Sequence, residues 1–269
     1  MYSYQHAYHA GNAADAAKHA ILALVLARYT QKPAPLTYYE THAGRGLYPL
    51  TAPETARLRE YRTGLLPLLE TSDVPPGLHP WLALLRDTYE NQNAYPGSPL
   101  TAAGLLRPQD TLHVCEGHPG EVRHLRQACK TDRRIHIHAQ DGHRHILALL
   151  PPANQRGVLL IDPSYEVKTE YAQTVATVAA AQKKAPGLCT LVWYPLLAAG
   201  HHQSMVEGLK NFGIPSTFRL ELHWPPAGEE GRGLRGTGLL LLNAPYRLEE
   251  TLYPAHQWLA RTLGATPCL

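Results

Sequence analysis

The sequence is short of several residue types, and the scarcity and spacing of cysteine bear on the class of protein. Phenylalanine and methionine occur twice each among 269 residues, and cysteine occurs four times. Cys115, Cys129, Cys189 and Cys268 show no CxxC spacing. We therefore expect neither a disulfide framework nor a structural zinc site, and a reducing cytoplasm is the simplest setting.

Long apolar runs are also missing. The longest candidates, Ala20–Ala27 and Leu239–Leu242, fall short of the ~18 residues that a membrane span needs. The N-terminal MYSYQHAYHAGN lacks the charged head and apolar centre of a signal peptide. We therefore expect no membrane partner.

A large excess of one charge is missing as well. The formal net charge is only +3, which argues against a tail-driven, non-specific nucleic-acid binder. Residues 122–156 nevertheless carry seven basic and two acidic side chains. Such a segment is suited to a local contact with RNA phosphates. The alternative is an ordinary charged helix face, and the sequence leaves both open.

Strand-like runs alternate with helix-like stretches along most of the chain. This alternation predicts an α/β fold with a mostly parallel sheet that is covered on both faces. Near the C-terminus, Phe218–His223 and Gly238–Asn243 are too close for a helical crossover, so we expect an antiparallel edge hairpin. The preceding strand candidates are Leu36–Glu40, Thr111–Glu116, Arg134–Ala139, Gly157–Ile161 and Cys189–Tyr194.

One region interrupts the alternation. From residue 53 to residue 93 the patterns are helical, with no strand expected between the first glycine loop and Tyr95. We predict a small helical insert (53–93) within a single domain that covers 1–269. Before the first strand, Asn12 or Gly11 is expected to cap a buried helix over 13–29.

Three ionisable residues, Asp15, Lys18 and His19, lie within that predicted buried helix. Charged groups there need polar neighbours, because burying an unpaired charge is costly. A ligand or partner charges meet this need, and so does an ordinary buried ion pair.

Acidic residues follow four successive strands of the predicted sheet. Glu40 precedes the glycine-rich THAGRG, and Glu116, Asp141 and Asp162 each come directly after, or within two residues of, a later strand. The carboxyl ends of parallel strands share one edge of a sheet, and ligands bind there. The absence of GxGxxG and of GxxxxGK[ST] argues against NAD and ATP as those ligands.

The segment Asp162-Pro163-Ser164-Tyr165 resembles the [DNS]PP[YFW] motif of amino-methyltransferases. The Asp162 carboxylate and the Pro163 carbonyl would accept the two N–H hydrogens of an exocyclic amine and offset positive charge that develops on its nitrogen. Tyr165 would stack on the extruded base. These are the predicted catalytic residues. Ser164 replaces the second proline, and a simple turn with a core tyrosine is the alternative.

Six motifs together resemble the bacterial ribosomal large-subunit RNA methyltransferase J family. They occur in the family's order: YQHAYHAGNAADAAKH, ETHAGRG, YPGSPL, CEGHP, QDG and IDPSYE. The resemblance covers nearly the whole chain. It implies a class I methyltransferase, Rossmann-like fold and transfer of a methyl group from S-adenosylmethionine to N6 of an adenine in 23S rRNA.

Residue roles follow from matching motif positions. The resemblance implies that Asp162 is catalytic and that Tyr4 contacts the RNA. Lys18 is adjacent to the cofactor set and suited to neutralise the methionine carboxylate. Glu40 stands where relatives commonly carry Asp, so we expect it only to support the site. The implied cofactor contacts are His19, His42, Ser98, Glu116, Asp141, Gly142 and Asp162.

Other interpretations stay open at this point. Related chemistry on DNA adenine or on a protein glutamine uses the same motif, and Ser164 is compatible with an RNA-binding or assembly protein of weakened catalysis. The pairs His136/His138 and His143/His145 have HxH spacing but no third ligand at a familiar spacing, so we expect no metal site. The expected partner is protein-free or assembling 23S rRNA, bound by a monomer.

Overall fold

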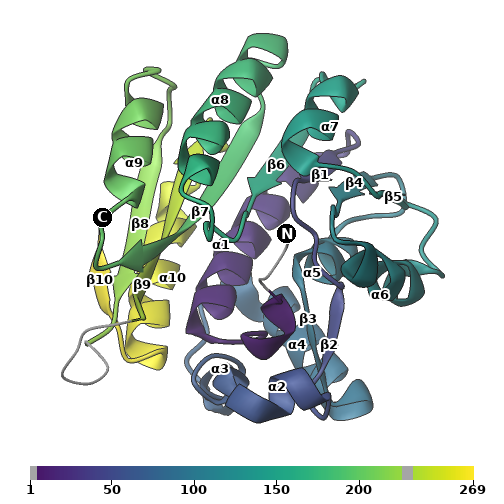
Figure 1. Cartoon of the computed structure of the whole chain (residues 1–269), viewed down its shortest axis with the longest axis vertical. Helices are drawn as coiled ribbons and strands as arrows, with labels where there is room; N and C mark the ends of the chain where they lie inside the picture. Colours follow the sequence, from purple (N-terminus) through teal and green to yellow (C-terminus); the bar gives the residue numbers. More distant parts are fainter. Residues whose placement is uncertain (1–4, 226–232) are drawn as a thin grey trace.

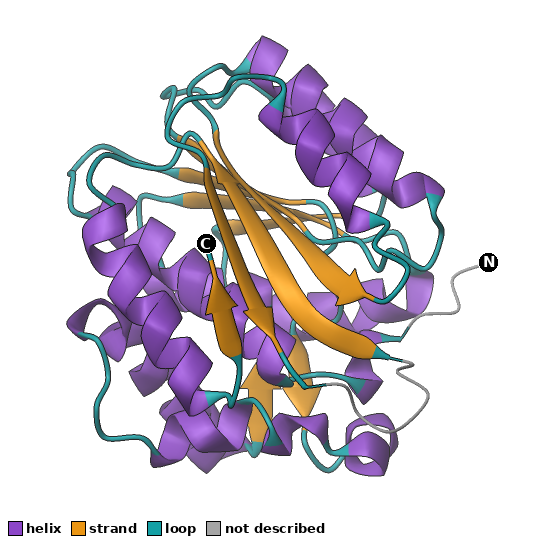
Figure 2. Ribbon diagram, turned by 90° about the vertical axis from the view of Figure 1, so that its left-hand side faces the viewer, coloured by secondary structure: helices purple, strands orange, loops and turns teal. Residues whose placement is uncertain are grey.

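The computed structural model describes residues 5–225 and 233–269, and an eight-stranded twisted sheet runs through the molecule (Figures 1 and 2). The strand order is β10-β8-β9-β7-β6-β1-β4-β5. The strands are β1 (Thr37–Glu40), β4 (Thr111–Cys115), β5 (Ile135–His138), β6 (Gly157–Ile161), β7 (Cys189–Leu197), β8 (Phe218–His223), β9 (Leu234–Leu242) and β10 (Thr266–Cys268).

The central part of this sheet is parallel, as the alternation predicts. β1 pairs in parallel with β4 and β6, and β5 and β7 extend the parallel part on either side. β9 lies antiparallel between β7 and β8. The predicted antiparallel pair is therefore confirmed, but β8 is not the edge, because the unpredicted β10 pairs antiparallel outside it.

Helices cover both faces of the sheet. Tyr38 belongs to one apolar core and the next residue, Tyr39, to the other, as expected for a strand buried on both faces. One layer holds α1 (Ala13–Thr30), α5 (Ser98–Leu105), α6 (Pro119–Cys129) and α10 (Glu249–Thr262). The other holds α7 (Gly142–Leu149), α8 (Thr169–Lys184) and α9 (His202–Lys210), in front of the sheet in Figure 1.

Helix α1 agrees closely with its prediction. The Asn12 side chain accepts a hydrogen bond from the backbone N–H of Asp15, which satisfies a free amide at the helix start. The helix is buried from Ala13 to Leu26.

None of the helices in residues 5–225 and 233–269 combines the length and the apolarity that crossing a bilayer requires.

Between Pro53 and Gln92, all of which the structure describes, helices are the only regular elements. Helix α2 ends at Leu58, because Arg59 takes a left-handed conformation (φ 54°). A strand pair that the sequence did not predict, β2 (Leu47–Pro49) with β3 (Ala94–Pro96), joins the two ends of this insert. The helices are α2 (Pro53–Leu58), η2 (Glu60–Arg62), α3 (Leu65–Glu70), η3 (Pro76–Leu78) and α4 (His79–Gln92).

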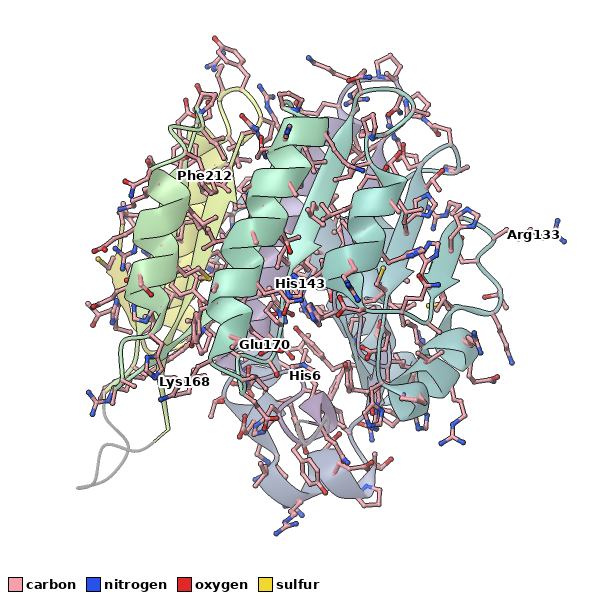
Figure 3. The ribbon with its side chains drawn as sticks, turned by 45° about the horizontal axis from the view of Figure 1, so that its top comes forward. His6, Arg133, His143, Lys168, Glu170 and Phe212 are labelled. Carbon is pink, nitrogen blue, oxygen red and sulfur yellow. The ribbon has the colours of Figure 1, made fainter. Side chains whose placement is uncertain are left out.

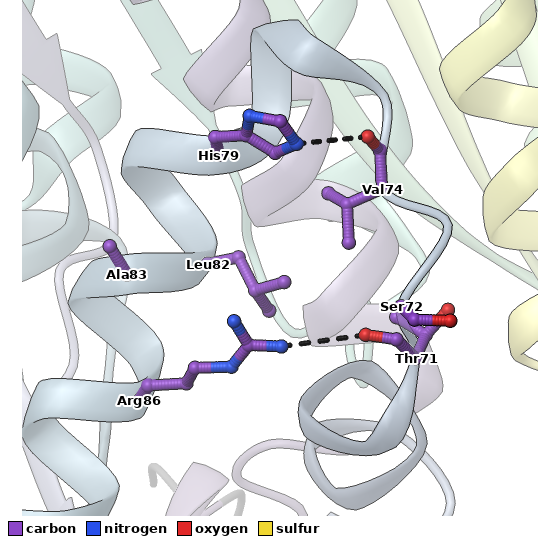
Figure 4. A pocket seen from close by; sticks show the side chains of 7 residues that line it. All are labelled: Thr71, Ser72, Val74, His79, Leu82, Ala83 and Arg86. Atoms are coloured by element: carbon purple, nitrogen blue, oxygen red, sulfur yellow. Dashed lines mark hydrogen bonds between the residues drawn. The ribbon is translucent and has the colours of Figure 1, made fainter.

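The insert also contains a pocket of its own, between α4 and the loop after α3 (Figure 4). His79 Nε2 donates to the Val74 carbonyl at 3.0 Å, and Arg86 donates to the Thr71 carbonyl at 3.4 Å. None of the residues predicted to form the site lines this pocket.

Candidate active site

The strand order identifies one place where a ligand fits the fold. After β1 the chain proceeds to β4 and β5 on one side, and then returns to β6 on the other side of β1. From β1 the chain continues to the strands on one side, and from β6 it continues to β7 on the other side. The position between β1 and β6 is therefore a topological switch point. In such sheets ligands bind in the crevice at the carboxyl ends of the two strands. Glu40 ends β1, and Asp162 directly follows β6.

Lys18 connects this crevice to helix α1. Its ammonium group donates to Asp162 Oδ2 at 2.6 Å and to Asp15 Oδ1 at 2.9 Å. All three side chains are largely buried; that of Asp162 is 12% exposed. The charges that the sequence placed in a buried helix therefore have both partner charges and a position beside the predicted catalytic residue.

The pKa values of this trio reflect a balance between burial and pairing. Burial lowers the pKa of Lys18, but the two carboxylates outweigh it and raise the pKa above its ordinary value. Burial raises the pKa of Asp162, and the ammonium group of Lys18 opposes that rise. For Asp15, pairing with His6 and Lys18 outweighs burial and holds the pKa well below its usual range. Lys18 therefore makes the largest contribution that favours an ionised Asp162, and His6 adds to it.

The N-terminal segment is attached to the same cluster. His6 Nε2 lies 2.8 Å from Asp15 Oδ2, and the backbone N–H of Gly11 donates to the same oxygen at 3.0 Å. In Figure 3 His6, His143 and Glu170 come from three separate elements and fall in the same part of the view. His6 was missed by the sequence reasoning, although it lies within the YQHAYH block.

A second buried polar group surrounds the carboxylate of Glu40 at the end of β1. The Ser98 hydroxyl donates to Glu40 Oε1, and the Tyr38 hydroxyl donates to Oε2 of the same carboxylate at 3.1 Å. Burial raises the pKa of Glu40 to about 8. His19 shares a 2.7 Å hydrogen bond with the Tyr95 hydroxyl, and burial lowers its pKa to about 3, so its imidazole is neutral near pH 7.

The glycine loop after β1 is held against the end of β4. Glu116 accepts hydrogen bonds from the backbone N–H groups of Gly44 at 2.8 Å and His118 at 2.7 Å. Gly44 has φ +60°, and a Cβ there would overlap the Tyr48 hydroxyl, so only glycine suits this turn. Burial raises the pKa of Glu116. Each of its oxygens keeps a further lone pair, which suits a diol such as a ribose.

Asp141 and Gly142 form the start of helix α7. Asp141 is exposed and its side chain caps the helix by accepting from the backbone N–H of Arg144 at 3.1 Å. A Cβ at Gly142 would overlap the carbonyl of Thr41, so the helix approaches the end of β1 directly. The ring of His42, which follows Thr41, packs edge-on against that of His143, with ring centroids 5.0 Å apart. Burial lowers the pKa of His42 to about 3.

Tyr165 is packed inside the protein. Its side chain is buried and its hydroxyl donates to the Trp193 carbonyl at 2.8 Å, while its ring packs on Tyr171 with centroids 4.4 Å apart. Tyr165 thus takes the core position that the sequence left open as the alternative. Pro163 is buried beside Asp162, and the Ser164 hydroxyl lies 3.4 Å from Glu170 Oε2.

Two further expectations meet the structure differently. Tyr4 lies outside the described residues. In the basic segment, Arg134 donates to the carbonyls of Ala103 and Leu106, and Arg156 donates to that of Tyr29. These two guanidinium groups hold loops together. The basic side chains of the segment that are exposed are Arg123, Arg126, Lys130, Arg133 and Arg144.

The histidines with HxH spacing contact one another. His138 lies 3.1 Å from His113 and 2.9 Å from His145, nitrogen to nitrogen, and burial lowers the pKa of His113 to about 4. His143 hydrogen-bonds the Thr177 hydroxyl at 2.9 Å.

Comparisons with known proteins identify the family. A profile of the family described as ribosomal RNA large subunit methyltransferase D, RlmJ, matches residues 33–267. The ribosomal RNA large subunit methyltransferase J of Escherichia coli (strain K12) is 35% identical over 262 residues, which cover 96% of this chain and 93% of that protein. The chain belongs to this family.

Further relatives agree with this assignment. The methyltransferase J of Haemophilus influenzae is 32% identical over 98% of this chain and 94% of its own length. A crystal structure of a Legionella pneumophila protein superposes with a TM-score of 0.88, at 31% identity and 97% coverage of both chains. The protein described here is therefore a class I methyltransferase, and its methyl donor is S-adenosylmethionine.

Proposed function

We propose that this methyltransferase transfers a methyl group to N6 of one adenine in 23S rRNA. The observation that carries the proposal is the position of Asp162 and Pro163, directly after β6 at the switch point and beside Lys18. The names of both curated relatives, which refer to large-subunit ribosomal RNA, support the substrate.

Asp162 and Pro163 would orient the amine. An exocyclic amine is a weak nucleophile because its lone pair is delocalised into the ring. One carboxylate oxygen and the Pro163 carbonyl accept its two hydrogens, which orients the lone pair and offsets the positive charge that develops on nitrogen. Lys18 maintains the charged carboxylate that this role needs, because it opposes the effect of burial on the pKa of Asp162.

The residues at the switch point also fit S-adenosylmethionine, which supplies an electrophilic methyl group when bound. Glu116 has lone pairs for ribose hydroxyls, and the Gly44 turn lets the backbone approach the ligand closely. His143 Nε2 is a buried polar atom without a hydrogen-bond partner, beside His42. We assign the cofactor to Lys18, His19, His42, Ser98, Glu116, Asp141, Gly142 and Asp162.

On the RNA side, we assign contacts to Tyr4 and to the helical insert. The segment His6–Tyr8 packs on α2, and the Arg57 guanidinium lies over the Tyr8 ring, 6.0 Å from its centroid. Arg57, Arg59 and Arg62 are exposed on this insert and suit phosphate contacts.

We propose a monomer, with 1–269 as one domain and 53–93 as its insert, that acts on protein-free or assembling rRNA in the cytoplasm.

One experiment separates this function from its alternatives. The purified protein is incubated with labelled S-adenosylmethionine and, separately, protein-free 23S rRNA, assembled large subunits, duplex DNA and total cell protein. We expect label in the 23S rRNA as N6-methyladenine at a single position, and less in assembled subunits. Label in DNA or in protein glutamine instead would reject the proposal. RNA binding with no transfer to any substrate would favour an assembly role.

A further inference from the structure

Three residues that the proposed function does not use meet at the far edge of the sheet. Glu221 and His223 lie two residues apart on β8, so their side chains share one face. The antiparallel register sets Cys268 of β10 opposite Glu221. One ligand atom from each of the three residues lies within 4.8 Å of the other two.

The cluster offers three different kinds of ligand atom, unlike a cluster of surface carboxylates. A thiol, an imidazole and a carboxylate are the three side-chain types that bind zinc in proteins. Glu221 is buried, while His223 and Cys268 are exposed, so an ion can reach the cluster from solvent.

Hydrogen bonds from neighbouring side chains fix the orientation of the Glu221 carboxylate. Its Oε1 accepts from the Tyr194 hydroxyl at 2.9 Å and from Arg219 at 2.7 and 2.9 Å. Its Oε2 faces His223 Nε2 at 3.3 Å. These contacts lower the pKa of Glu221, although burial works against them. One oxygen is therefore fixed by the fold, and the other is directed at the imidazole.

We propose that Glu221, His223 and Cys268 form a zinc site that fastens the C-terminal strand β10 to β8. The ion binds the Glu221 carboxylate, the His223 imidazole and the Cys268 thiolate, and solvent completes the coordination. The thiol loses its proton to solvent when the metal binds. The residues of β10 are exposed, and a three-residue edge strand holds few backbone hydrogen bonds. A metal ion that links β10 to β8 would therefore stabilise this edge of the sheet.

The test uses the full-length protein after removal of metal with a chelator. Cobalt(II) chloride is added as a spectroscopic substitute for zinc, and we expect a thiolate-to-cobalt charge-transfer band at one equivalent. Cys268→Ser should remove the band, and His223→Gln should weaken metal binding about 100-fold or more. His136→Gln, an exposed histidine on β5, is the matched control and should bind like the wild type.

A second measurement does not depend on the spectrum. Zinc sulfate should slow amide hydrogen exchange at Thr266 and Cys268 of the wild type, and it should leave the exchange at residues 266 and 268 unchanged in Cys268→Ser. A band that survives in Cys268→Ser would overturn the proposal, because another thiol would then hold the metal. Equal metal affinity in wild type and His223→Gln, or exchange in β10 that zinc does not slow, would overturn it too.

Discussion

The ammonium group of Lys18 lies 2.6 Å from Oδ2 of Asp162, which joins helix α1 to the loop after β6 across 144 residues of sequence. The same ammonium group is 2.9 Å from Asp15. The carboxylate proposed as catalytic therefore has a fixed counter-charge, and that charge has a second partner that remains when Asp162 is replaced.

Replacing Lys18 with methionine should move the acid limb of the pH–rate profile to higher pH. Without the ammonium group, the largest contribution that opposes the effect of burial on the pKa of Asp162 is lost, so ionisation needs a higher pH. At pH values below the new pKa, the ionised and active fraction falls about tenfold as the pH drops by one. The measurement is kcat/KM on 23S rRNA from pH 6 to pH 9. Lys18→Arg keeps the charge and should keep the acid limb; an unchanged limb in Lys18→Met would refute the pairing argument.

Asp162→Asn should slow methyl transfer by roughly 10²–10³-fold, because the amide accepts a hydrogen bond without supplying negative charge. Lys18 keeps its bond to Asp15 in this variant, so the fold should stay close to that of the wild type and binding of S-adenosylmethionine should remain measurable. Single-turnover kinetics and calorimetry measure the two quantities. Glu207→Gln, an exposed residue of α9, is the control. Full activity in Asp162→Asn would exclude the catalytic role.

Gly142→Ala should destabilise the protein by about 1–3 kcal/mol, since its methyl group would overlap the Thr41 carbonyl and push α7 away from β1. Affinity for S-adenosylmethionine should fall with stability, because both elements line the switch point. Gly187→Ala is the matched control, because a Cβ there meets nothing within 4 Å. Urea unfolding and calorimetry compare the two, and equal values for both variants would contradict the steric argument.

Glu40→Gln should change how stability depends on pH. The folded-state pKa of Glu40 is raised from 4.5 to about 8, so its neutral form stabilises the fold at low pH and that stability is lost as pH rises towards 8. The glutamine never ionises. Relative to the wild type, the variant should gain stability between about pH 4.5 and pH 8, by at most about 1.4 kcal/mol per pH unit. Urea unfolding at several pH values checks this, and a difference that does not vary with pH would disprove it.

The parallel core of the fold and the edge that carries the site were predictable, because both follow from local patterns. Strands of apolar residues that end in Glu40, Glu116 and Asp162 must deliver those carboxylates to one edge once the sheet is parallel. The buried charges of α1 could likewise be recognised as needing partners. Their identity could not, because Lys18 meets Asp162 only through tertiary packing.

Other features had no local signal. Strand β10 has three exposed residues and contains Pro267, so nothing in its pattern indicates a strand. The break after α2 depends on Arg59, which adopts a left-handed conformation that sequence does not predict for arginine. Arg134 and Arg156 look like phosphate ligands in the sequence, but nearby loops present backbone carbonyls to them.

The position of β9 and α10 has a consequence for how the fold supports the candidate site. Helix α1, which carries Lys18, packs against α10 and β9. Unless residues 249–262 are folded, one apolar side of α1 lacks its cover. The position of Lys18 therefore depends on α10, although none of the predicted site residues belongs to that helix.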